Sequence, residues 1–356
     1  MSNPSKIDSS TSYRSVLLFA LALIAAIGLA FHLERSNASS TNEASGNDLN
    51  IPSIAVPQEL DQAARVVAPR PLNQSELSAA RKAWRYFETQ TDAVTGLTYS
   101  VKDYPATTMW ELGGQLMATV SAAKLDLISQ SDAERRLVLA LTSLAQLPLV
   151  QDRLPNQSYN AQSLAMTDYT NRPEKSGTGV SVLDVMRAVT GLQIVAKNFQ
   201  SLAPQVQSIL KRWDLGTLIE GGSLVGLHPD GKGSLVAKQE GRLGYEQYAA
   251  RAALALGLDA YKAASVAGKA TAATVNGQVL PKDKRSEATH GRASVLTSEP
   301  FLMEVLEYGW RDDTRAMALA VYQAQKAESE RIGQLTVVSE DHLDQAPYFA
   351  YTGVLV

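Results

Sequence analysis

Apolar residues recur at helical spacing over most of the chain after residue 73, and the helical segments are joined alternately by short and long connections. Helix pairs joined in this way can form a closed ring, and the long connections can then build a cleft at one end of it. Such a ring is an α/α toroid. We therefore predict an all-α fold with helices near residues 74–90, 108–127, 132–147, 180–200, 204–213, 243–266, 299–309 and 313–331.

Short local signals refine this prediction. Several helix starts carry a capping box, in which a small polar residue is followed three positions later by a glutamate that satisfies backbone N–H groups. The pairs are Asn73 with Glu76, Thr108 with Glu111, and Ser131 with Glu134. Residues 222–238 and 334–356 contain short extended runs with turn residues, so we expect small β-hairpins in the loops.

Residues 15–33 form an uncharged apolar stretch that is long enough, as a helix, to cross about 30 Å of hydrocarbon. Lys6 and Arg14 precede it and favour a cytoplasmic N-terminus, whereas residues 36–38 offer a small-residue cleavage site. The sequence predicts a single-pass anchor in a bacterial inner membrane, with the main domain in the periplasm. A removed signal peptide is the alternative.

The predicted domain organisation follows from these patterns. Residues 34–72 are low in aromatics, lack apolar periodicity and are expected to form a flexible linker. The predicted parts are a cytoplasmic N-terminus (1–14), a transmembrane anchor (15–33), the linker (34–72) and a toroid domain (73–356).

Composition excludes several functions. The chain has no cysteine, so disulfides and thiolate chemistry are ruled out, and its four histidines are scattered without metal-ligand spacing. A formal charge of −3, without a block of basic residues, gives no footprint for nucleic acid. No phosphate-cradling loop or nucleophile elbow is present. We therefore expect no cofactor, no metal and no nucleic-acid partner.

The stretch GRLGYEQYAARAALALG, residues 241–257, places Tyr245, Glu246 and Tyr248 in the first turn of an alanine-rich helix. The two tyrosines share one face with the buried alanines, so the phenols lie where loops and solvent meet the core. A structural role is the alternative for these residues, with Arg242 pairing with Glu246 at i, i+4.

The combination of acid and aromatic residue recurs at other element ends. Its members are Trp110 with Glu111, Tyr245 and Tyr248 with Glu246, Glu299 within LTSEPFLMEVLEYGW, and Glu340 and Asp341 ahead of Tyr348. Aromatic faces stack on sugar rings, and two carboxylates that flank a glycosidic bond can act as general acid and as base or nucleophile. A capping role for first-turn acids such as Glu111 and Glu299 is the alternative.

The loop LPNQSYN, residues 154–160, offers further polar groups. Asn156 and Tyr159 could hydrogen-bond a ligand from it, although loops are generally rich in such residues. A cation at Glu340 and Asp341 has no further support in the sequence.

Several separated motifs, in one order, together resemble the bacterial envelope family labelled domain of unknown function 3131. The motifs are TTMWELGGQLMATVSAAKL, LPLVQDRLPNQSYN, SVLDVMRAV, EGRLGYEQYAARAALALG, TSEPFLMEVLEYG and LTVVSEDHLDQAPYFAY, within residues 74–356. The family is related to glucoamylase-like toroids, which include endo-β-1,2-glucanases and a domain of cyclic β-glucan synthases. The resemblance implies an (α/α)6 barrel with its acids in a groove at one end.

The resemblance also assigns positions. Its recurring residues fall on Trp110, Glu111, Asp184, Arg187, Tyr245, Glu246, Tyr248, Glu299, Glu340 and Asp341. The predicted helices number eight or nine rather than twelve, and the chain stops at Val356, so an incomplete ring stays open as an alternative.

Two functional hypotheses result. The first is a membrane-tethered periplasmic glycoside hydrolase that acts on a β-glucan or an exopolysaccharide. Glu299 and Glu340 are its candidate acid and partner, Glu111 and Glu246 are reserves, and Trp110, Tyr159, Tyr245 and Tyr248 bind sugar. The second is a non-catalytic glycan-binding or scaffold protein of an envelope polysaccharide synthesis or secretion system.

Overall fold

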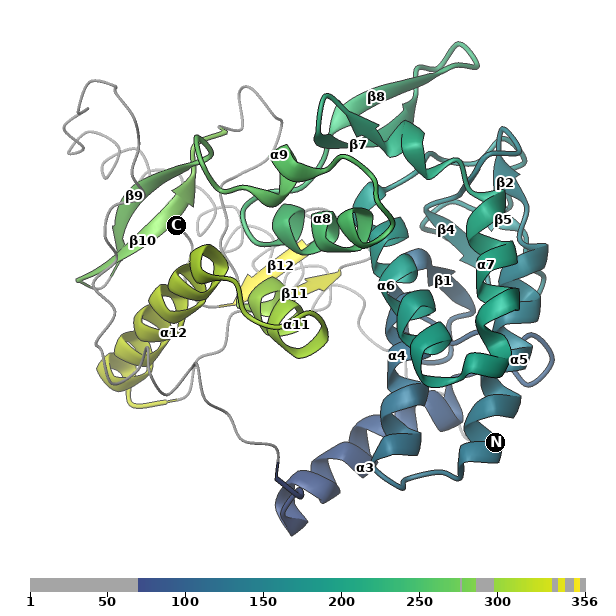
Figure 1. Ribbon diagram of the computed structural model, residues 1–356, viewed down its shortest axis with the longest axis horizontal. Coiled ribbons are helices and arrows are strands. Elements are labelled where there is room, and N and C mark those ends of the chain that lie inside the picture. Colours follow the sequence, from purple (N-terminus) through teal and green to yellow (C-terminus); the bar gives the residue numbers. More distant parts are fainter. Residues whose placement is uncertain (1–69, 276, 286–297, 335–338, 343–348, 353–356) are drawn as a thin grey trace, which may run out of the picture. The chain divides into compact units, whose positions relative to one another are not determined.

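The computed structural model describes residues 70–275, 277–285, 298–334, 339–342 and 349–352 (Figure 1). All of them belong to the second of two compact units, Asn50–Val356. In these ranges, none of the helices has both the length and the hydropathy that a bilayer-spanning segment needs. The predicted anchor at residues 15–33 lies outside the described residues and stays a prediction.

Helices dominate the described residues, and most begin and end within three residues of the predicted positions. They are α3 (Gln74–Thr89), α4 (Met109–Lys124), α5 (Gln130–Gln146), α6 (Val182–Asn198), α7 (Ala203–Arg212), α8 (Tyr245–Ala255), α9 (Tyr261–Ala264), α11 (Glu299–Glu307) and α12 (Asp312–Ile332), with short 3-10 turns at Gln200–Leu202 and Leu215–Leu218. The prediction of one helix over residues 243–266 is wrong. That helix ends at Ala255 because Gly257 adopts a left-handed backbone with φ 78°, which terminates helices.

Two of the three predicted capping boxes are confirmed. Glu76 N–H donates to Asn73 Oδ1 at 2.9 Å, and Asn73 N–H donates to Glu76 Oε2 at 2.8 Å. Thr108 and Glu111 form the equivalent pair at the start of α4. The third prediction is wrong, because α5 begins two residues earlier than expected and Ser129 caps it by accepting the N–H of Asp132 at 3.1 Å.

The strands are short and form separate small sheets. They are β1 (Ala106–Thr108), β2 (Leu149–Val150), β3 (Leu154–Pro155), β4 (Ser158–Asn160), β5 (Met166–Thr167), β6 (Ile219–Glu220), β7 (Ser223–Pro229), β8 (Leu235–Gln239), β9 (Ala270–Val275), β10 (Gln278–Asp283), β11 (Ser339–His342) and β12 (Phe349–Thr352). The predicted hairpins are confirmed as β7–β8 and β11–β12, both antiparallel. The β9–β10 hairpin was not predicted.

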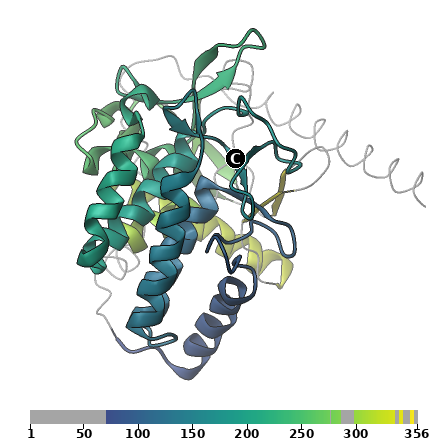
Figure 2. The ribbon, with the colours of Figure 1, turned by 90° about the vertical axis from the view of Figure 1, so that its right-hand side faces the viewer.

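The helices are arranged in two layers. The helices α4, α6, α8 and α11 contact one another in that order, while α5 lies against α4, and α7 lies against both α5 and α6. The helices α4 to α7 run side by side in Figure 1 and again in Figure 2. Short connections join α4 to α5 and α6 to α7, and long ones lead to α6, α8 and α11, as the sequence predicts.

Two glycines allow α4 and α6 to approach closely. A Cβ at Gly113 would lie 2.6 Å from the carbonyl carbon of Arg187, and one at Gly191 would lie 2.7 Å from the carbonyl oxygen of Gly113. Backbone atoms cannot rotate away from such a collision, so only glycine fits at these positions. This contact fixes the register between the two helices that carry Trp110 and Arg187.

Apolar side chains from α4, α5, α6, α7 and α8 form the main core. A smaller core joins the start of α8 to the β9–β10 hairpin, α11 and α12. Its buried members are Leu243, Val266, Ala270, Phe301, Met317 and Val321. This second core holds α11 in place beside α8.

Candidate functional site

The N-terminal parts of four helices come together at one place. Trp110 is in the first turn of α4, Tyr245 is the first residue of α8 and Glu299 is the first residue of α11. Arg187 comes from the second turn of α6. Helix N-termini carry partial positive charge, so this convergence favours carboxylates and polar ligands.

Aromatic rings form the centre of the cluster. The Trp110 ring lies 5.9 Å from the ring of Tyr245 and 6.3 Å from that of Tyr248, measured between centroids. Tyr248 in turn contacts Tyr308 edge-to-face at 6.1 Å. Trp110 and Tyr245 are half-buried, whereas Tyr248 is fully buried, so the first two provide the part of the cluster that a ligand can reach.

Glu299 joins this cluster through Tyr245, whose hydroxyl donates to Glu299 Oε2 at 2.6 Å. The backbone makes the contact possible. Gly244 precedes α8 with φ 92°, and a Cβ there would lie 2.6 Å from Pro300 Cγ. The starts of α8 and α11 can therefore meet only because residue 244 is glycine.

Arg187 lies beneath the aromatic rings and is held by an acid that the sequence analysis did not select. Its guanidinium carbon is 5.3 Å from the Trp110 ring centroid and 5.5 Å from that of Tyr248. Arg187 Nη1 donates to Glu307 Oε1 at 2.6 Å and also to the Tyr248 hydroxyl. The Tyr248 hydroxyl donates to Glu307 Oε2 at 2.6 Å. The three side chains form one network in which Tyr248 is fully buried and Arg187 and Glu307 are largely buried.

Burial and charge shift the proton affinities of this network. Burial alone would lower the pKa of Arg187, but its contacts with Tyr248 and Glu307 outweigh that effect and raise the pKa. Burial is the main cause that raises the pKa of the Tyr248 phenol, and it raises the pKa of Tyr308 to about 12. At neutral pH, Arg187 is therefore a cation and both phenols are protonated hydroxyl donors.

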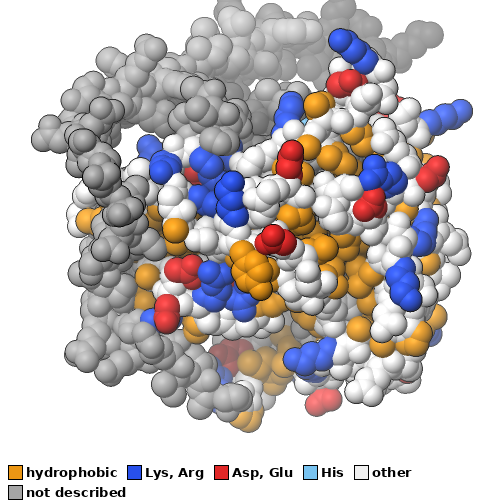
Figure 3. Space-filling model, turned by 45° about the horizontal axis from the view of Figure 1, so that its top comes forward, with side chains coloured by type: hydrophobic (Ala, Val, Ile, Leu, Met, Phe, Trp, Pro, Cys, Tyr) orange, Lys and Arg blue, Asp and Glu red, His pale blue; other side chains and the backbone are white. Residues whose placement is uncertain are grey.

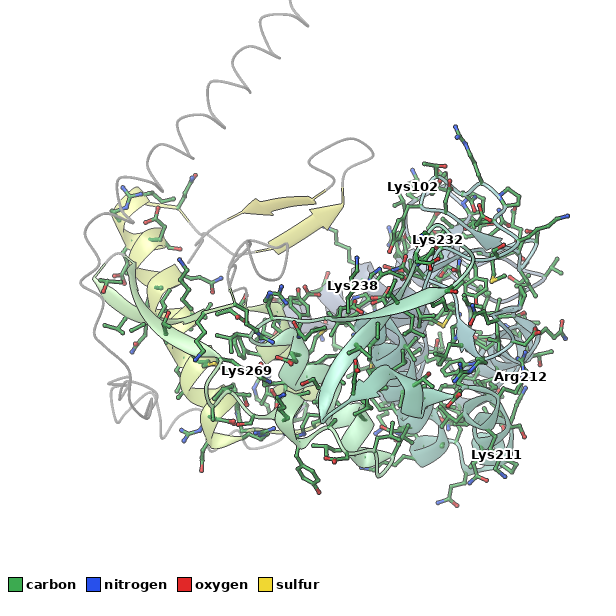
Figure 4. The ribbon with its side chains drawn as sticks, turned by 90° about the horizontal axis from the view of Figure 1, so that it is seen from above. Lys102, Lys211, Arg212, Lys232, Lys238 and Lys269 are labelled. Atoms are coloured by element: carbon green, nitrogen blue, oxygen red, sulfur yellow. The ribbon has the colours of Figure 1, made fainter. Side chains whose placement is uncertain are left out.

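Glu246 does not face a ligand site. It is 1% exposed, and its Oε2 lies 2.9 Å from Arg285 Nη1 and 3.1 Å from the Nζ of Lys269, which is labelled in Figure 4. Asp283 pairs with Arg285 from the same hairpin. This argues against Glu246 as a catalytic reserve, because its carboxylate ties α8 to the β9–β10 hairpin.

The carboxylate of Glu111 acts as a cap. Its Oε2 accepts the Thr108 N–H at 3.0 Å and also the Thr108 hydroxyl. This is the structural alternative that the sequence left open, and it argues against a catalytic role. Asp184 is a half-buried first-turn residue of α6 whose N–H donates to Ser181 Oγ at 3.2 Å.

Asn156 and Tyr159 are fully buried and serve the loop rather than a ligand. The Asn156 amide donates to two backbone carbonyls and accepts from Thr178, at distances of 2.7 to 3.2 Å. The Tyr159 hydroxyl accepts the Asn156 N–H at 2.6 Å and donates to the Pro148 carbonyl at 2.8 Å. These contacts favour a structural role for the two residues, and their predicted role in binding substrate stays a prediction.

Glu340 and Asp341 lie in β11, where they pair in register with Tyr351 and Ala350 of β12. Their side chains lie outside the described part of the structure, so their predicted roles stay predictions. Within the described residues, no group of three or more histidine and acidic side chains could hold a metal ion.

Sequence reasoning missed Glu307 and Tyr308, which lie at the C-terminal end of α11. An acid next to an aromatic residue is the same signal as at the other element ends, and the quoted segment LTSEPFLMEVLEYGW contains both residues. Sequence reasoning also missed Glu240, whose carboxylate accepts the Ser181 hydroxyl at 2.6 Å and the Val182 N–H at 2.9 Å and so caps α6.

Three solved structures of similar fold are distant from the chain in sequence. An endo-β-1,2-glucanase from Chitinophaga pinensis, in complex with sophorotriose and glucose, gives a TM-score of 0.57 at 12% identity, over 79% of this chain and 74% of that chain. A "putative glucoamylase" from Bacteroides fragilis gives 0.56 at 12% identity, over 80% and 75%. Another, from Bacteroides uniformis, gives 0.57 at 10% identity, over 80% and 74%. These likenesses establish a shared helical fold.

At the level of sequence, no curated protein matches the chain. A family model does match, over residues 78–356, which is most of the chain and includes every residue of the cluster described above. The chain belongs to the family described as "Protein of unknown function (DUF3131)".

Proposed function

We propose that this chain is a carbohydrate-active protein, a glycoside hydrolase that acts on a β-glucan or an exopolysaccharide with a pair of carboxylates. The observation that carries the proposal is the contact of Glu299 with Tyr245 beside the ring of Trp110. An aromatic ring that is half-buried can stack on a sugar ring, and a carboxyl group beside it can protonate the glycosidic oxygen.

In the proposed mechanism, Trp110 and Tyr245 hold a sugar ring and Glu299 protonates the leaving glycosidic oxygen. Glu340 is the proposed partner, either as the base that activates water or as the nucleophile that forms a glycosyl–enzyme intermediate. Tyr245 would orient the Glu299 carboxyl through their hydrogen bond. Once Glu299 has given up its proton, its carboxylate is negatively charged. The positive N-terminal ends of the converging helices stabilise this charge.

The shared fold supports the choice of substrate class. Two of the structural neighbours are titled "putative glucoamylase" and one is an endo-β-1,2-glucanase. We infer that α4, α6, α8 and α11 belong to an (α/α)6-type toroid and that the loops at their N-terminal ends form the glycan groove.

The proposed setting is the bacterial periplasm. Residues 15–33 would anchor the domain in the inner membrane and residues 34–72 would tether it, so that it can reach a polysaccharide during synthesis or export. Envelope polysaccharide machinery is the partner that this setting suggests.

A second candidate is a non-catalytic glycan-binding or scaffold protein. It is favoured by the structural use of two predicted acids, since Glu111 caps α4 and Glu246 is buried in ion pairs. In that case the aromatic cluster would hold a polysaccharide without cleaving it.

One experiment separates the two candidates. The full-length chain is incubated with a panel of β-glucans and bacterial exopolysaccharides, and new reducing ends are measured for wild type, Glu299→Gln and Glu340→Gln. Glu330→Gln is the control, because this side chain is 69% exposed on α12. If the protein is a hydrolase, wild type and the control variant release new reducing ends, and both site variants do not. Binding by calorimetry without any release would favour the scaffold, and neither binding nor release would refute both.

A further inference from the structure

Arg187 is a cation next to the ring of Trp110, the proposed sugar platform. Its guanidinium carbon lies 5.3 Å from the Trp110 ring centroid, and its side chain is only 12% exposed. An arginine at such a place can bind the carboxylate, sulfate or phosphate group of an acidic sugar, because its fork of donors matches these groups. The group that neutralises the charge of Arg187 therefore determines whether the site accepts acidic or uncharged sugars.

Glu307 supplies that neutralisation from inside the protein. Its Oε1 accepts from Arg187 Nη1 and its Oε2 accepts from the Tyr248 hydroxyl, both at 2.6 Å, and its side chain is 13% exposed. Both carboxylate oxygens are thus engaged by neighbours. At this burial, solvent screens the pair weakly, so its two charges cancel each other rather than being dispersed by water.

A second pair on the same helix gives a built-in comparison. Glu304 Oε1 lies 3.0 Å from Arg251 Nη1, and Arg251 lies over the ring of Tyr308 at 5.3 Å. This pair has the same chemistry, with the Arg251 side chain 20% and the Glu304 side chain 3% exposed. It contacts Tyr308 instead of Trp110, so it isolates the effect of position.

We propose that the Glu307–Arg187 pair makes the sugar position at Trp110 selective for an uncharged residue, with Glu307 as the specificity-determining side chain. The inference rests on the proposed function, because it assumes that Trp110 contacts a glycan. On the face drawn in Figure 3, acidic side chains lie among the basic ones.

The test uses matched probes and the full-length chain. The probes are β-1,2-, β-1,3- and β-1,4-linked glucotrioses and the same trisaccharides with their C6 hydroxyl groups oxidised to carboxylates. Calorimetry at two salt concentrations measures their affinities for wild type, Glu307→Gln, Arg187→Gln/Glu307→Gln and the control Glu304→Gln. Circular dichroism checks the fold of each variant.

Wild type is expected to bind a neutral trisaccharide at least about tenfold more tightly than its oxidised form. Glu307→Gln keeps an acceptor for Tyr248 but frees the cation, so affinity for the oxidised form should rise about tenfold and fall again with added salt. The double variant, which has neither charge, should lose that gain. Glu304→Gln should leave the preference as in wild type.

If wild type binds the oxidised form and the neutral form with equal affinity, the inference is overturned, whether or not any variant folds. A folded Glu307→Gln that keeps the wild-type preference would overturn it too, while neutral binding would leave the proposed function standing. If wild type binds none of the six probes but cleaves a polysaccharide of the panel, the inference is overturned and the hydrolase stands. Failure in both assays overturns the two together.

Discussion

Replacing Gly113 by alanine tests the close contact between α4 and α6 that positions the proposed site. The new Cβ would lie 2.6 Å from the Arg187 carbonyl carbon and 2.9 Å from the Ala188 nitrogen, well inside ordinary contact at 3.4 Å. Both obstacles are backbone atoms, so the helices must separate. Overpacking of this kind costs about 3 kcal/mol, and the better helix propensity of alanine returns about 1 kcal/mol. We expect a net loss of about 2 kcal/mol.

The adjacent glycine is the matched control. Gly114 is on the same helix, and a Cβ there would meet no atom within 4 Å. Gly114→Ala should therefore stabilise the protein by about 0.5–1 kcal/mol. Thermal unfolding followed by circular dichroism should show a melting temperature lower by about 4–8 °C for Gly113→Ala and slightly higher for Gly114→Ala. Equal stability of the two variants would refute the account of the helix contact.

Three further changes probe other contacts. Glu246→Gln removes the carboxylate that two cations, each 12% exposed, share, and should cost about 3–5 kcal/mol in urea unfolding. A loss under about 1 kcal/mol would show that the cluster is not stabilising. Burial alone would raise the pKa of Asp283, but the hydrogen bonds of its carboxylate outweigh burial and lower the pKa. The stability that Asp283 contributes is therefore present above its unfolded pKa of about 3.9 and is lost as pH falls through its folded pKa. Asp283→Asn should flatten that acid limb, and an unchanged pH profile would contradict the assignment. Gly226→Ala would push its Cβ into the Glu240 carboxylate that caps α6 and should cost about 1–2 kcal/mol, whereas Gly216→Ala, which meets nothing within 4 Å, should cost far less.

The helices were predictable because their signals are local. The caps at Asn73 and Thr108 and the apolar periodicity act within one or two turns, so they do not depend on the rest of the fold. The β9–β10 hairpin was missed because alanine-rich sequence continues past residue 260. The Asn276-Gly277 pair between Val275 and Gln278 was the available signal, since this dipeptide favours tight hairpin turns.

The site was predictable only in part, because its contacts join residues far apart in the sequence. The residues Trp110, Arg187, Tyr245, Tyr248 and Glu299 were predicted from two signals, the local pairing of acid and aromatic residues and the family resemblance. The structure brings them into one cluster. No local pattern shows that a distant acid such as Glu307 meets an arginine on another helix. Nor does any local pattern distinguish an acid in a groove from one buried under a hairpin.

The most direct test of the central claim is the affinity of neutral β-linked gluco-oligosaccharides for the full-length chain. Tyr245→Ala removes one of the two half-buried rings of the cluster and the partner of Glu299, whereas Tyr261→Ala removes a tyrosine that is 73% exposed outside the cluster. Calorimetry should show binding by wild type, an affinity at least about tenfold weaker for Tyr245→Ala, and no change for Tyr261→Ala. Equal binding by wild type and Tyr245→Ala would contradict a glycan site at the ends of α4, α6, α8 and α11.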